Sequence, residues 1–382
     1  MLNNIKFFYK KNISKIYYLL LLLMLLGYVL KVFNGAGGDL GLRISEAKYF
    51  LHGINPYDVY IGRVEIIDGY GYPNAYSFLS YYFAAPFALI DGYLSQRIIF
   101  SLVDISALVG GIFLTNRMLN TKENTSAIIT FVLLNSVFFW QQVNTLNYNL
   151  IATFGLLVVF YGLSCKNLAY SVLGVIIIGL KPSIAIPVFV YLLFARRWKP
   201  LFLSGIIYLG ILFLTAIWTS TSPVDLLLQL KDTQSKFSNG HTDGFFFFIK
   251  PFIGDKITAL GGVLTIILIY LFKEKLEDPL NGLVLVTAIG IGLFYNHVHA
   301  WIISYPLLII AISNYKDRDK SIFPIISMLI FLLVPRLSGL FSNDNIDLYV
   351  SIHNILRFGL LFVTAYFLVK SRHAADKLSG DA

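Results

Sequence analysis

Apolar runs of about membrane-spanning length follow one another along almost the whole chain. Clear examples extend from Ile16 to Phe33, from Ile98 to Asn116, from Pro200 to Trp218 and from Ile346 to Val369. A transmembrane helix needs about 20 mostly apolar residues, so the pattern predicts an all-α polytopic membrane protein with about twelve spans. The spans are expected near 16–33, 98–116, 125–140, 149–164, 167–180, 183–195, 200–218, 257–272, 279–295, 299–313, 321–335 and 346–369.

Two longer polar segments lie between these spans, at 34–97 and 219–256, and the remaining connections are short. About twelve spans use most of the 382 residues, so we expect 1–382 to form a single transmembrane domain. Any catalytic site is then built from loops and helix ends.

Composition and charge set the class and the orientation. Only 13% of the residues are charged, against about 25% in soluble proteins, which excludes a soluble fold. The net charge of +9 suggests nucleic acid at first, but most of the 30 basic residues fall in segments that are cytoplasmic if the N-terminus is inside. This bias follows the positive-inside rule. We therefore expect cytoplasmic termini, both long loops outside, and no nucleic-acid partner.

The segment Tyr76–Ile90 leaves the topology open. It is apolar but short, and Pro86 lies inside it. An interfacial or re-entrant segment is the preferred interpretation. If Tyr76–Ile90 spans the membrane instead, 167–195 becomes one long helix across Lys181. The connections between these two segments then lie on the opposite side of the membrane.

The first long loop reads GAGGDLGLRISEAKYFLHGINPYDVY from Gly35. It predicts a helix from about Asp39 to His52, which Gly53 ends before the turn at Asn55. The helix has an apolar stripe that we expect on the membrane surface, formed by Leu40, Ile44, Ala47 and Leu51. Asp39 suits a helix N-cap, and it also suits a general base that takes a proton from a sugar hydroxyl. The two roles are compatible.

An ordered set of short motifs carries a family resemblance. The set is Asp39 after the first span, His52-Gly53-Ile54-Asn55-Pro56-Tyr57, Tyr72-Pro73, Gln141-Gln142-Val143-Asn144, Leu180-Lys181-Pro182, Arg196-Arg197-Trp198 and the later Asn296-His297-Val298-His299. In order and spacing it resembles the bacterial polyprenyl-phosphate-mannose-dependent alpha-mannosyltransferases, glycosyltransferase family 87 of the GT-C superfamily. The resemblance implies a GT-C-type fold and Asp39 as the catalytic base. In the motif Gln141-Gln142-Val143-Asn144, the leading Gly that is usual in the family is replaced by Gln141.

A lipid-phosphate sugar donor needs cations to stabilise the leaving phosphate. The candidates are Lys181, His297, His299 and Arg43. Lys181 is also compatible with snorkelling to the interface, and the two histidines with ordinary interfacial positions or, less well, with a metal site. Candidate substrate contacts are Asn55, Tyr57, Tyr72, Gln142, Asn144 and His241. Gln142, Asn144 and Asn147 follow an apolar run and also suit a helix cap. No metal and no cofactor is expected.

The chain has no glycine-rich phosphate loop and no dinucleotide fingerprint, so a nucleotide-sugar donor has no evident docking domain. We therefore expect a membrane glycosyltransferase that moves a sugar, mannose in the first place, from a polyprenyl phosphate to a lipid or glycan acceptor. The reaction is expected on the outer face of a bacterial cytoplasmic membrane, by inverting substitution with Asp39 as base. The alternatives are a polysaccharide polymerase or ligase that uses lipid-diphosphate glycans, and a secondary transporter. The early position of the long loop argues against the first, and the lack of matching repeat halves against the second.

Overall fold

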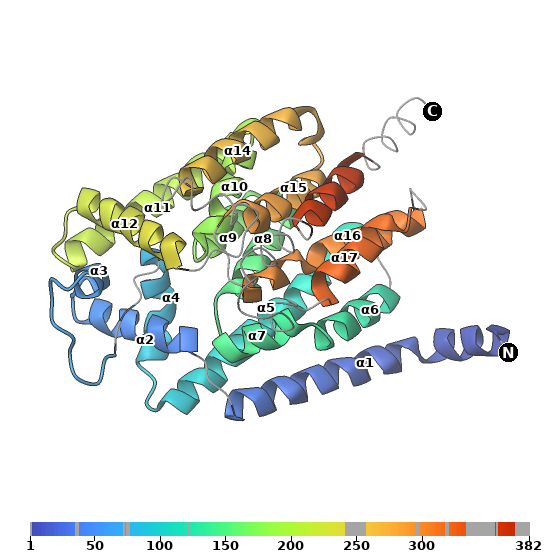
Figure 1. Cartoon of the computed structure of the whole chain (residues 1–382), viewed down its shortest axis with the longest axis horizontal. Coiled ribbons are helices and arrows are strands. Elements are labelled where there is room, and N and C mark those ends of the chain that lie inside the picture. The colour runs from blue at the N-terminus through green and yellow to red at the C-terminus, as the bar shows by residue number, and fades with distance from the viewer. Residues whose placement is uncertain are drawn as a thin grey trace, which may run out of the picture.

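The computed structural model of the chain is built from helices joined by mostly short connections (Figure 1). It describes residues 2–34, 38–71, 73, 77–120, 123–240, 257–294, 298–317, 321–333, 356 and 358–370. Every regular element within these residues is a helix, which confirms the all-α class. The helices are α1 (Leu2–Asn34), α2 (Gly38–Leu51), α3 (Pro56–Tyr60), α4 (Phe78–Ala88), α5 (Tyr93–Leu119), α6 (Glu123–Leu134), α7 (Val137–Thr145), α8 (Asn149–Ser164), α9 (Leu168–Ile178), α10 (Pro182–Phe194), α11 (Trp198–Trp218), α12 (Pro223–Gly240), α14 (Ile257–Leu271), η3 (Lys273–Lys275), α15 (Pro279–Gly292), η4 (Val298–Ser304), α16 (Tyr305–Asp317), α17 (Phe323–Leu333) and a last helix over Phe358–Lys370.

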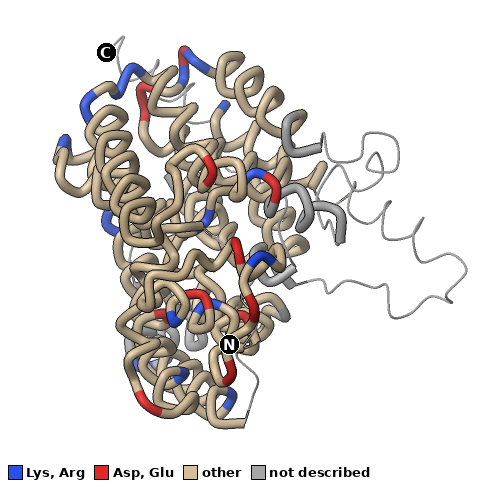
Figure 2. The backbone as a smooth tube through the Cα atoms, turned by 90° about the vertical axis from the view of Figure 1, so that its left-hand side faces the viewer, with Lys and Arg blue, Asp and Glu red and all other residues tan. Residues whose placement is uncertain are grey.

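Several of these helices are typical of a membrane protein. Helices α5 and α11 are each long and apolar enough to cross a bilayer, and the bent pairs α1–α2 (65°) and α7–α8 (111°) bring the number to four if each pair is one span. The other apolar helices in the described part of the chain have 10–17 residues. Charged residues are sparse along the tube in Figure 2. The number of about twelve spans stays a prediction.

The single helix expected over 125–140 is wrong. The chain forms α6 and α7 instead, with a break at Asn135 and Ser136. The Asn135 amide donates to the carbonyl of Phe131 at 2.8 Å, and the Ser136 hydroxyl donates to the carbonyl of Leu332 in α17 at 3.0 Å. Short polar side chains that bond to nearby or facing backbone compete with helix continuation, which explains the break. The segment expected at 299–313 is likewise divided, into η4 and α16.

Helices α2, α3, α4 and α12 gather at the end of the molecule opposite the N-terminal end of α1 (Figure 1). The helix predicted from Asp39 to His52 is confirmed as α2, and Gly53 follows it with φ +73°. Asn55 then caps α3, because its Oδ1 accepts from the backbone N–H of Tyr57 at 3.1 Å. The Asn55 amide also donates to Gln229 Oε1 of α12 at 2.9 Å, which joins the two long polar segments of the sequence.

The expected position of the α2 apolar stripe on the membrane surface is wrong. Leu40, Ile44 and Ala47 are buried by protein, with exposed fractions of 0%, 3% and 0%. Helix α4 packs along α2, and α3 and α7 also contact it. An apolar stripe of this width is equally suited to a protein core, and α4 supplies that core here.

Helices α8, α9 and α10 form the centre of the bundle (Figure 1). The α8–α9 contact is close because glycines lie in it: a Cβ on Gly174 would lie 2.6 Å from the carbonyl oxygen of Gly155 and 2.5 Å from the backbone nitrogen of Val159. Small residues of this kind let two helices in a membrane approach at backbone distance. This packing fixes the connection at the far end of α9, which carries Lys181.

Candidate active site

Asp39 lies in the first turn of α2, where it is half-buried. Its Oδ2 accepts a hydrogen bond of 2.7 Å from the side-chain amide of Asn147, which belongs to the turn between α7 and α8. The N-terminal end of a helix also carries partial positive charge and favours a carboxylate. Asp39 is therefore held as an oriented acceptor by a donor 108 residues away in sequence.

Lys181 lies in the short connection between α9 and α10 and is the N-cap of α10. Only 6% of the residue is exposed. Burial lowers the pKa of Lys181 to about 8, while the charge of Asp39 opposes this decrease and the charge of Arg43 adds to it. Since each of these charges acts on Lys181, the structure brings Asp39, Arg43 and Lys181 into one electrostatic group.

Arg43 lies one helical turn after Asp39 and is 3% exposed. Its Nη1 donates to Glu46 Oε1 at 2.5 Å, and the other oxygen of Glu46 accepts from the hydroxyl of Ser80 at 3.3 Å. Glu46 thus offsets the charge of Arg43. Among the described residues, Lys181 forms no ion pair of this kind with a carboxylate. Of the two cations, Lys181 is therefore better placed to bind an anionic group of a substrate.

A buried polar network supports the turn that carries Asn147. Gln142 is fully buried, and its amide nitrogen donates to the carbonyl of Asn147 at 2.5 Å and to Asp104 Oδ2 at 3.2 Å. Its amide oxygen accepts from Asn149 at 2.8 Å, and Asp104 Oδ2 also accepts from the hydroxyl of Tyr28 at 2.7 Å. Through these bonds the Gln142 amide supports the end of α7 and the turn that carries Asn147.

The remaining predicted residues lie in different places. Asn55 and Tyr57 belong to α3, and Tyr57 is fully buried with its ring 6.0 Å from that of Tyr81. Asn144 is half-buried in the last turn of α7. His299 belongs to η4, which packs against α7, and only its backbone is described. The predictions for Tyr72, His241 and His297 lie outside the described residues.

Comparison with known families decides the class of the protein. The family model for glycosyltransferase family 87 matches residues 74–306, which is more than half of the chain. The chain belongs to glycosyltransferase family 87. Comparisons with curated proteins and with solved structures gave no match.

The family 87 match shows that the protein is an enzyme that transfers a sugar from a donor to an acceptor. Its apolar helices show that it is a membrane glycosyltransferase. In this glycosyltransferase, sequence patterns pointed to Asp39 and Lys181 but not to the role of Asn147 as the hydrogen-bond donor to Asp39. The same holds for the bond between Asp104 and Tyr28. Both pairs join helices far apart in the chain, and no local spacing signals such a contact.

Within the residues that the structure describes, no group of three or more His, Cys, Asp or Glu side chains lies close enough together to hold a metal ion. Lys181 and Arg43 place two positive charges near Asp39. A base and a cation in one partly buried group can serve proton removal and phosphate binding in the same reaction.

Proposed function

We propose that this family 87 glycosyltransferase transfers a sugar, mannose in the first place, from a polyprenyl phosphate to a lipid or glycan acceptor. The site faces outward from a bacterial cytoplasmic membrane, with both termini in the cytoplasm. The observation that carries the proposal is that the charge of Asp39 acts on the buried side chain of Lys181, although the two residues are 142 positions apart in the sequence.

Asp39 acts as the general base. The acceptor hydroxyl gives its proton to the carboxylate while its own oxygen attacks the anomeric carbon, and the bond from that carbon to the phosphate oxygen breaks on the opposite side. A β-linked donor then gives an α-linked product. Asn147 donates to Oδ2 of Asp39 at 2.7 Å and so orients the carboxylate for proton transfer.

Lys181 binds the donor phosphate. The phosphodiester of the donor gains one negative charge when it leaves as polyprenyl phosphate, and a buried cation stabilises that charge more strongly than water does. With a pKa of about 8, Lys181 is mostly protonated at neutral pH. Arg43, His297 and His299 remain proposed further phosphate contacts, and Asn55, Tyr57, Tyr72, Gln142, Asn144 and His241 remain proposed substrate contacts.

The test is sugar transfer by the Asp39→Asn variant in liposomes that contain a mannosyl polyprenyl phosphate and extracted envelope lipids. Asparagine keeps an oxygen that can accept from Asn147 and suits a helix N-terminus, so we expect a folded protein whose turnover falls by about 10²- to 10⁴-fold. The control is Asp68→Asn, the same change at an exposed position of the same loop, which should keep normal turnover. Turnover of Asp39→Asn close to that of the control would refute the assignment, and transfer from lipid-diphosphate glycans instead would favour a polymerase or ligase.

A further inference from the structure

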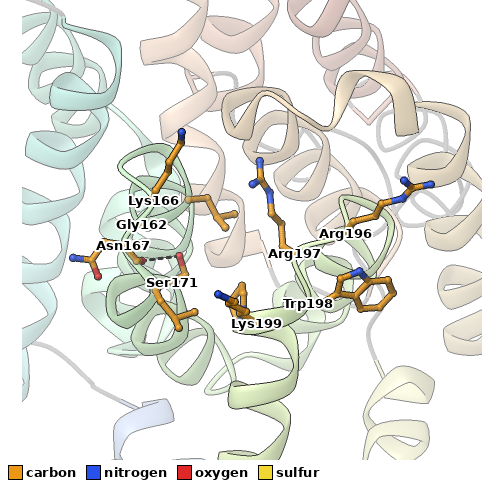
Figure 3. A pocket seen from close by; sticks show the side chains of 11 residues that line it. Gly162, Lys166, Asn167, Ser171, Arg196, Arg197, Trp198 and Lys199 are labelled. Atoms are coloured by element: carbon orange, nitrogen blue, oxygen red, sulfur yellow. Dashed lines mark hydrogen bonds between the residues drawn. The ribbon is translucent and has the colours of Figure 1, made fainter.

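A basic pocket of about 440 Å³ lies at the end of the α9–α10 pair opposite to Lys181 (Figure 3). Two connections form it, one from α8 to α9 and one from α10 to α11. Its lining includes four basic residues and no acidic residue. The basic residues are Lys166, Arg196, Arg197 and Lys199.

The two connections have the same backbone structure. Lys166 and Arg196 follow α8 and α10 in the left-handed region, with φ values of 55° and 54°. The next residue in each, Asn167 or Arg197, donates its backbone N–H across the connection at 2.7 Å or 2.8 Å and is the N-cap of the following helix. Both α9 and α11 therefore begin at the pocket, and the positive ends of their dipoles add to the four side-chain charges.

In the part of the chain that the structure describes, none of the four basic residues forms an ion pair with a carboxylate. Arg197 donates to the carbonyl of Glu277 at 3.3 Å and also bonds with the hydroxyl of Tyr191, while its Nε is buried with no partner among the described residues. Figure 3 shows Lys166 and Arg197 extending in the same direction from opposite sides of the pocket, whereas Arg196 points away beyond Trp198. Cationic side chains that extend from two sides of a pocket suit a group with several anionic oxygens, such as a phosphate.

The surface next to the pocket is apolar and exposed. Trp198 stacks on Phe202, with ring centroids 6.0 Å apart, and 62% of Phe202 is exposed. Exposed apolar side chains continue along α11 at Ile206 and Leu209, and along α9 at Leu173. Helix α11 is long and apolar enough to span a bilayer, so the pocket lies where a span begins and where lipid headgroups are found. A free phosphate would contact only the basic side chains. A phospholipid would contact the basic side chains with its headgroup and the apolar surface with its acyl chains.

We propose that this pocket binds the headgroup of an anionic phospholipid. The phosphate lies among Lys166, Arg197 and Lys199, and the acyl chains follow the exposed side chains of α9 and α11. The proposal does not depend on the sugar-transfer function, since the pocket and Lys181 lie at opposite ends of the α9–α10 pair and the test measures binding.

The experiment uses the purified full-length protein in a neutral detergent and counts bound lipid by native mass spectrometry. The probes are phosphatidylglycerol, phosphatidylcholine with the same acyl chains, and glycerol 3-phosphate as the headgroup without chains. We expect one tightly bound phosphatidylglycerol, weaker binding of phosphatidylcholine, and no competition by glycerol 3-phosphate at equal concentration. Competition by the free headgroup would show a site for soluble anions, and equal binding of the two lipids would show a site without charge selectivity; either result overturns the proposal.

Two matched double variants separate a local site from general basic charge. Lys166→Gln with Lys199→Gln removes two positive charges from the pocket, and Lys273→Gln with Lys275→Gln removes two from η3, outside the pocket lining. The pocket variant should bind phosphatidylglycerol about 30-fold more weakly, while the η3 variant should bind it normally. Equal losses in both variants overturn the proposal. If the pocket variant does not fold, the exposed single change Lys199→Gln must weaken binding by about fivefold, and unchanged binding overturns the proposal.

Discussion

Burial of Lys181 should lower the stability of the protein while it supports activity. The ordinary pKa of a lysine is 10.5, and burial lowers that of Lys181 to about 8. The folded state therefore binds fewer protons than the unfolded state between these pH values, so the free energy of unfolding rises with pH across this window and is lowest below it. The difference corresponds to about 3 kcal/mol at neutral pH. Lys181→Met removes the buried charge, and we expect this variant to unfold at a higher temperature than the wild type.

The same substitution should nearly abolish sugar transfer. A cation about 4 Å from a phosphate contributes about 4 kcal/mol at an effective dielectric constant of about 20, which corresponds to a loss on the order of 1000-fold in kcat/KM. The wild type should also lose activity above about pH 8, as Lys181 loses its proton. Lys181→Arg stays charged at every pH used, so its alkaline limb should move to higher pH.

The measurements are thermal unfolding in detergent and kcat/KM in liposomes from neutral to alkaline pH. A lysine that only snorkels to the interface predicts near-normal transfer by Lys181→Met and an alkaline limb that is the same in Lys181→Arg as in the wild type. Either result would refute a role for Lys181 in phosphate binding. A lower unfolding temperature of Lys181→Met would refute the energetic reasoning.

Three further substitutions test the hydrogen bonds near Asp39 and the packing of α8 against α9. Asn147→Ala removes the 2.7 Å bond to the carboxylate and should lower kcat by about 10- to 100-fold with normal expression, measured in the same liposomes; unchanged kcat would mean that Asn147 does not position the base. Gln142→Ala leaves buried polar partners unsatisfied and should lower the free energy of unfolding by about 1–3 kcal/mol, whereas a conservative Asn144→Gln at the half-buried neighbour serves as the control. Gly174→Val places a Cβ 2.5 Å from the backbone of α8, so folded protein should be lost on size-exclusion chromatography, and a folded, active variant would contradict the packing.

Much of the helical pattern could be predicted from the sequence, because a long apolar run has few alternatives to a helix. The segment predicted at 149–164 coincides with α8, and the helix predicted from Asp39 begins one residue earlier. The failures have a common cause. The break at Ser136 depends on a hydrogen bond to α17, and the burial of Leu40 depends on α4, and neither partner can be identified from the local pattern.

The candidate site was predictable only in part. Asp39 and Lys181 stand out because charged residues are rare in this chain and both adjoin helix ends. Their common electrostatic group joins α2 to the α9–α10 connection, and the family resemblance supplied the link that spacing alone does not give. Gln142 is a predicted sugar contact because it follows an apolar run, and its bonds to Asn147, Asn149 and Asp104 in the fold could not be read from that pattern.

The glycine contact between α8 and α9 has a consequence for how the enzyme can adapt. Helix α8 begins two residues after Asn147, and α9 ends three residues before Lys181, so the proposed positioning donor and the proposed phosphate cation adjoin two helices that pack at backbone distance. Such a fixed pair does not reorganise as charge moves from the acceptor to the phosphate. Asp39 is carried by α2, a separate part of the chain, so its approach to Lys181 depends on how α2 sits against this packed pair of helices.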